Sequence, residues 1–181
     1  NLVRPWRPFL EAIWAALAAT SASNAPFRSV WRAQIQISLD WIMAFLSSSS
    51  GTLTREWLIE SYVNPDADVV MTLDASPYGL GAVLQERGVI TKYLFSKLTV
   101  HDTRILGQPL KTSKGQQVWE TLNVLVSLRA WLPLWEGKRV QVHIKADNMA
   151  ALAAASALKG KKGVGLILRE LALLYSSGSF T

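Results

Sequence analysis

A run of alternating apolar residues that ends at an aspartate constrains this chain more than any other stretch. Residues 67–75 (ADVVMTLDA) alternate and carry β-branched side chains, which predicts a strand. Asp74 lies near its end, where an isolated carboxylate in a buried strand would be costly. Two further strand-like runs, 79–85 and 89–96, are joined by the short hairpin connection 86–88. The sequence therefore predicts three successive antiparallel strands with an acid on the first.

The rest of the second half alternates helical patterns with one more strand. Residues 97–113 lack sustained periodicity and predict a loop. After it, the patterns predict a helix over 114–135, a fourth strand over 139–146, a helix from Asp147-Asn148 to about Gly160, and a last helix over 164–176. This order predicts an α/β fold in which helices flank a mixed sheet.

Two amphipathic helices are predicted before the first strand. Residues 5–20 place Phe9, Ile13, Ala16 and Leu17 on one stripe, and residues 29–47 do the same with Val30, Ile37, Trp41 and Phe45. The serine run that ends at Gly51 is linker-like, so we divide the chain into a helical extension, 1–51, and a domain, 52–181, that begins with an extended segment. The two apolar faces have no evident partner within the chain, so if the chain is not an active enzyme, we expect a partner protein to bury them.

Composition limits the classes of protein to consider. The chain has 181 residues, half of them hydrophobic, which is enough for one sizeable core. It has no cysteine, which excludes disulfides and cysteine-bound zinc, and no apolar run reaches the roughly 18 residues of a membrane span. No secretory signal is visible. The formal charge of +6 lies wholly in residues 67–181, which fits either a polyanion-binding domain or solubility charge.

Three carboxylates stand out by their settings. Asp74 ends a strand, Glu120 lies in a helix that is otherwise mostly apolar, and Asp147 stands where a strand gives way to a helix. If the fold brings them together, their mutual repulsion calls for a divalent cation, and oxygen ligands favour Mg²⁺ or Mn²⁺. Two such ions would serve phosphodiester hydrolysis.

Each acid also has a plain structural interpretation. Asp74 suits the start of a turn, and Asp147 suits a helix N-cap. Glu120 suits a surface ion pair with Lys114 or Arg129.

The order of the three acids resembles the ribonuclease H domain of retroelement reverse transcriptases. The matching blocks are DASPYGLGAVL, the W-E-T-L helix and the A-D-N turn, within about residues 67–176. Residues 27–60 resemble, more loosely, the connection segment that precedes that domain. A DDE-type nucleotidyl transferase fits less well, because here the glutamate comes between the two aspartates.

The resemblance implies a function and a set of roles. Asp74, Glu120 and Asp147 would be the catalytic metal ligands for Mg²⁺ or Mn²⁺, and the substrate would be the RNA strand of an RNA–DNA hybrid. Lys159, Lys161 and Lys162 are candidates for contacts with the nucleic acid, with a solvated helix end as the alternative.

The resemblance also implies a fifth strand and a last helix that carries a fourth carboxylate. The residues up to Thr181 supply neither, and Glu170 comes too early in the order to replace that carboxylate. We therefore expect the fifth strand and last helix to be missing, and metal binding to be weaker. The alternative hypothesis is an inactive fold of the same type that serves as a structural or interaction subunit.

Overall fold

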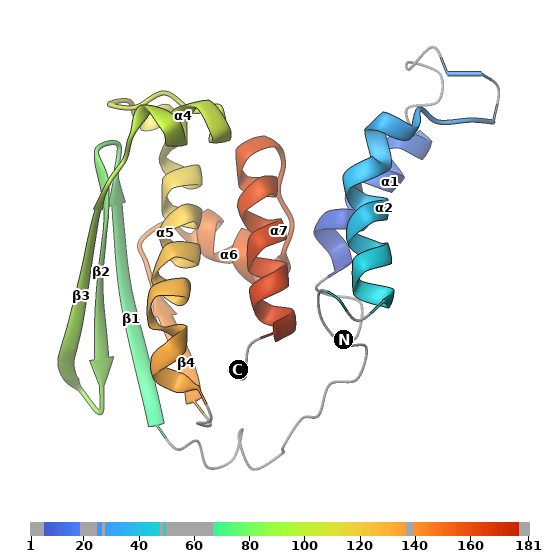
Figure 1. The fold of residues 1–181 in the computed structure, drawn as a ribbon. Helices are drawn as coiled ribbons and strands as arrows, with labels where there is room; N and C mark the ends of the chain where they lie inside the picture. The colour runs from blue at the N-terminus through green and yellow to red at the C-terminus, as the bar shows by residue number, and fades with distance from the viewer. Residues whose placement is uncertain are drawn as a thin grey trace.

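The computed structural model describes residues 6–18, 25–26, 28–47, 49, 67–136 and 140–177. Within them a four-stranded mixed sheet is flanked by six α-helices (Figure 1). The predicted lead-in segment and the predicted boundary at residues 51 and 52 lie outside the described residues. None of the described helices is long and apolar enough to cross a membrane.

The sheet has the strand order β3-β2-β1-β4. Its strands are β1 (Ala67–Ser76), β2 (Gly79–Glu86), β3 (Val89–Lys97) and β4 (Val140–Lys145). The first three are antiparallel, as predicted, and β4 runs parallel to β1, which makes the sheet mixed. The connection between β2 and β3 has positive φ at both Arg87 and Gly88, which suits the two-residue hairpin turn.

The described helices all lie on one side of the sheet. The helix α5 (Gln116–Trp131) packs on β1 and β2, with α6 (Met149–Ala157) and α7 (Lys162–Ser177) behind it (Figure 1). Because side chains alternate along a strand, Val69, Met71 and Leu73 of β1 face these helices and are buried. Together with Trp119 and Leu128 of α5, they form the centre of the core.

The segment predicted as a loop over 97–113 contains a helix, α4 (Val100–Leu106). A capping box begins it: the Thr99 side chain accepts from the Asp102 N–H, and the Asp102 carboxylate accepts from the Thr99 N–H at 2.7 Å. The loop prediction is wrong because a single capping box outweighs the lack of periodicity in so short a helix. At its far end, the carbonyl of Leu106 lies so close to Gly163 of α7 that a Cβ there would clash with it.

The two N-terminal helices, α1 (Arg7–Ala18) and α2 (Arg32–Leu46), pack against each other, and α1 also packs on α7. Phe9 stacks on Trp41 with ring centroids 3.8 Å apart, and the Arg169 guanidinium of α7 lies over the Phe9 ring. The expectation that these helices have no partner within the chain is therefore wrong. Leu17 and Ile37, predicted on the buried stripes, are more than half exposed.

Candidate metal centre

Asp74 lies on β1 opposite Gly81 of β2, and its side chain is exposed. The alternation of the strand explains this position, since the neighbouring Leu73 and Ala75 are both buried on the helix-covered face. The turn after β1 depends on Ser76 instead, whose hydroxyl accepts from the N–H groups of Tyr78 and Gly79. In the part of the chain that the structure describes, the side-chain hydrogen bonds of this turn come from Ser76, not from Asp74. Because the Asp74 side chain is exposed, its charge is not buried.

Among the buried residues that the structure describes, Glu120 is the only charged one. It lies on the sheet-facing side of α5 and is only 1% exposed, so it is not the surface ion-pair partner of Lys114 or Arg129. One carboxylate oxygen accepts from the Ala75 N–H at 3.3 Å and from the Gln116 amide at 2.9 Å. Burial raises the pKa of Glu120, and the negative charges of Asp147 and Asp74 add to the increase, while the two hydrogen bonds oppose it.

Asp147 follows β4 directly, at the point where the chain leaves the sheet for α6. The N-cap of α6 is its neighbour Asn148, whose side chain accepts from the Ala151 N–H at 3.0 Å. Because Asn148 caps the helix, the N-cap interpretation does not explain Asp147. Its exposed carboxylate is available to the cluster instead.

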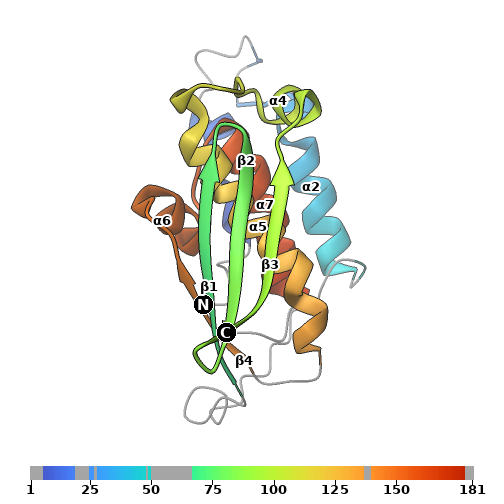
Figure 2. The same ribbon diagram turned by 90° about the vertical axis from the view of Figure 1, so that its left-hand side faces the viewer.

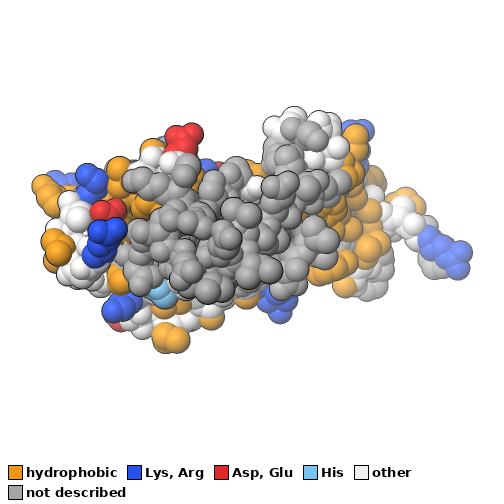
Figure 3. All heavy atoms as spheres, turned by 90° about the horizontal axis from the view of Figure 1, so that it is seen from below, with side chains coloured by type: hydrophobic (Ala, Val, Ile, Leu, Met, Phe, Trp, Pro, Cys, Tyr) orange, Lys and Arg blue, Asp and Glu red, His pale blue; other side chains and the backbone are white. Residues whose placement is uncertain are grey.

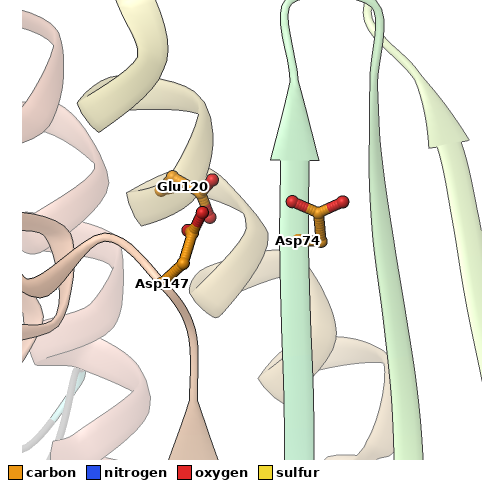
Figure 4. A group of neighbouring side chains, drawn as sticks. All are labelled: Asp74, Glu120 and Asp147. Carbon is orange, nitrogen blue, oxygen red and sulfur yellow. The ribbon is translucent and has the colours of Figure 1, made fainter.

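The fold brings the three acids together. One carboxylate oxygen from each of Asp74, Glu120 and Asp147 lies within 4.8 Å of the other two. Figure 4 shows that they come from three separate elements: β1, α5 and the segment after β4. Since β4 ends opposite Thr72, the edge of β1 is open beyond that point, and the cluster forms there.

The cluster suits a cation. The second oxygen of Glu120 is buried without a hydrogen-bond partner, which is costly for a carboxylate unless a ligand satisfies it. Mg²⁺ binds oxygen at about 2.0–2.1 Å, so opposite ligands of one ion are about 4.2 Å apart. The three oxygens lie within 4.8 Å of one another, and because Asp74 and Asp147 are exposed, their carboxylates can move closer to enter the shell of one ion. These three acids can therefore hold a metal ion.

Two polar residues around the cluster were not predicted. Gln116 of α5 donates to Glu120 and to the Ala75 carbonyl, and Asn123 donates to the carbonyls of Asp74 and Gly81 at 2.8 Å each. Asn123 is fully buried. Gln116, Glu120 and Asn123 lie on one helical stripe at i, i+4 and i+7. A polar stripe in an otherwise apolar helix is the sequence pattern that could have predicted the two additional residues.

Other candidate residues lie elsewhere. Lys159, Lys161 and Lys162 are exposed between α6 and α7, at the opposite end of α6 from Asp147. A nine-residue helix puts roughly 14 Å between its two ends. Glu170 pairs with Arg129 on the surface and takes no part in the cluster.

Comparison with known proteins does not assign the chain to a family. No protein-family model matches the sequence, and no match was found among curated proteins. The fold and the acid cluster define the chain as an α/β domain with a candidate carboxylate metal centre.

Proposed function

We propose that this chain is a ribonuclease-H-like nuclease module of a retroelement polyprotein, which hydrolyses the RNA strand of an RNA–DNA hybrid. The observation that carries the proposal is the convergence of Asp74, Glu120 and Asp147 to within 4.8 Å. The order of the acids along the chain and the mixed sheet, with β4 parallel to β1, are both compatible with that type of fold.

The three residues of the cluster differ in burial, and this gives them different roles in the proposed site. Glu120 is fixed by two hydrogen bonds through one oxygen and presents the other to the ligand. Asp74 and Asp147 are exposed, so they can adjust to a ligand and to a phosphodiester that approaches from solvent. Mg²⁺ or Mn²⁺, when bound, would supply an activated water and would stabilise the leaving oxygen.

The test is cleavage of an end-labelled RNA strand annealed to DNA, with and without Mg²⁺. We expect metal-dependent cleavage that Asp74→Asn reduces by several orders of magnitude, because a metal ligand is lost while the exposed side chain keeps its shape. Glu170→Gln is the matched control, since Glu170 lies in a surface ion pair outside the cluster. Cleavage that persists in Asp74→Asn would remove the assigned site.

A second function is favoured by a different observation. Ile37, Met43 and Leu46 on α2 are each more than half exposed, which is an unusual density of large apolar side chains on one helix. The same fold would then act without catalysis, as a structural or interaction subunit. Calorimetric Mn²⁺ binding without cleavage, together with self-association that Met43→Glu abolishes, would favour this function over the first.

A further inference from the structure

The face of the sheet that points away from the helices is not covered by any part of the chain that the structure describes, and we call it the open face. In Figure 2 this face points toward the viewer, and no described element lies in front of β1, β2 and β3. Two aromatic side chains of β3 stand on it: Tyr93 is 82% exposed and Phe95 is 69% exposed. Exposing two adjacent aromatic rings on a flat sheet is unfavourable for a domain that acts alone.

The strand register places these rings beside the metal centre. Phe95 lies opposite Gly81, which lies opposite Asp74, so the three form one row across the sheet. Neighbouring strands are about 4.8 Å apart, which places Phe95 about 10 Å from Asp74 along this row. The next row runs through Tyr93, Val83, Thr72 and Lys145.

Gly81 lies between Phe95 and Asp74 in this row, and because it has no side chain, the backbone of the sheet is exposed there. A Cβ built on Gly81 would meet only the Asp74 carbonyl at 3.6 Å, which is an ordinary contact, so packing does not require glycine here. Gly79 differs, because a Cβ there would lie 2.9 Å from the Ser96 carbonyl. Glycine in a strand without such a need marks a place where a ligand can approach the backbone.

Two lysines on this face can pair with phosphates, although the carboxylate of Asp74 lies on the same face. Lys145 ends the Tyr93 row, and Lys97 lies opposite Gly79 at the next position after Phe95; both are exposed. Lysine is depleted in protein–protein interfaces, whereas lysines around exposed aromatic rings are typical of single-strand binding. Figure 3 views the molecule from the end of the sheet at which β2 turns into β3, and hydrophobic and Lys or Arg side chains lie next to each other at the left-hand end of that view.

We infer that the open face of the sheet binds single-stranded nucleic acid, with bases stacked on Phe95 and Tyr93 and phosphates near Lys97 and Lys145. A duplex hides the faces of its bases, so exposed rings select an unpaired strand, as in other four-stranded sheets that stack bases on aromatic side chains. The inference rests on the proposed function for its choice of ligand. The inference adds that a nucleic-acid strand bound at the acid cluster continues, unpaired, across the open face of the sheet.

The test measures binding in EDTA, so that cleavage plays no part. A fluorescein-labelled oligo(dT) is titrated with the whole chain and followed by anisotropy, with a blunt RNA–DNA hybrid as the second probe. We expect the single strand to bind, and Tyr93→Ala with Phe95→Ala to weaken it by about 5- to 100-fold per ring. Lys97→Gln and Lys145→Gln should each lower the slope of log affinity against log salt by about 0.7.

Two control variants make the test specific. Trp14→Ala removes an exposed aromatic ring, 56% accessible, on α1 and should leave binding unchanged. Replacing Lys159, Lys161 and Lys162 with Gln removes the other basic cluster and should have less effect than the two lysines of the sheet. Because binding is measured in EDTA and cleavage is measured in Mg²⁺, a failure of catalysis is distinguishable from a failure of this inference.

Three results would overturn the inference. The first is no binding of oligo(dT) by the unaltered chain. The second is binding that depends on Lys159, Lys161 and Lys162 but not on the two rings. The third is a change of sedimentation mass, rather than of binding, in the Tyr93 and Phe95 variant, because this would assign the open face to contacts between copies of the chain.

Discussion

The two faces of the sheet differ in what they contribute. On the helix-covered face, Val69, Met71 and Leu73 of β1 are at most 3% exposed. On the open face of the same strand, Thr72 and Asp74 are exposed. The acid cluster lies where the faces meet, because Glu120 reaches it from the helix layer and Asp74 from the open side. Stability is thus concentrated on one face and the candidate chemistry at its border, so the two should be separable by mutation.

The largest expected effect comes from two adjacent residues on opposite faces. Met71→Ala removes a fully buried side chain and should lower the free energy of unfolding by about 2–5 kcal/mol. Thr72→Ala changes an exposed position and should stay within about 0.5 kcal/mol. Urea unfolding followed by circular dichroism measures both. Equal losses in the two variants would mean that the open face is covered.

The next effect concerns Asn123, which connects the faces by holding the backbone of Asp74 and Gly81. Asn123→Ala removes two buried hydrogen bonds and should cost about 1–3 kcal/mol. It should also weaken Mn²⁺ binding by about 10- to 100-fold, because the Asp74 backbone is no longer fixed. Calorimetry of the metal titration separates the two readouts.

The control for Asn123 is Ser127→Ala. Ser127 is also fully buried on α5, and its hydroxyl donates to the Asn123 amide oxygen at 3.3 Å. We expect some loss of stability with nearly unchanged Mn²⁺ affinity. If Asn123→Ala likewise leaves the affinity unchanged, then Asn123 serves the fold alone.

The smallest expected effect on stability is that of Glu120→Gln. Since the pKa of Glu120 is raised in the folded chain, the folded state binds the proton more tightly, and metal-free stability falls as pH rises from the unfolded value of 4.5 through the folded pKa. Glu120→Gln should remove this fall, so that in EDTA it is more stable than the unaltered chain at neutral pH but not at acid pH. Thermal melts across pH measure the difference, and parallel curves would contradict it.

Local sequence patterns were sufficient to predict much of this fold. Alternation predicted β1 to β4, and helical periodicity predicted α5 and α7. On α2 it predicted the buried positions of Trp41, which stacks on Phe9 of α1, and of Phe45, but it did not predict that Ile37 on the same stripe is exposed. The three acids followed from their settings, but Asn123 did not, since its role depends on two strands that lie more than 40 residues earlier in the sequence.

The contact between Gly163 and Leu106 has a consequence for how the molecule opens. The helix α4 follows β3 after only two residues, and its last turn is pressed against the first turn of α7. The outer edge of the sheet is therefore tied to α7, which lies behind α5, and the two should open together in native-state hydrogen exchange. Any side chain at position 163 would separate them, and the amides of β3 would then exchange faster than those of β1.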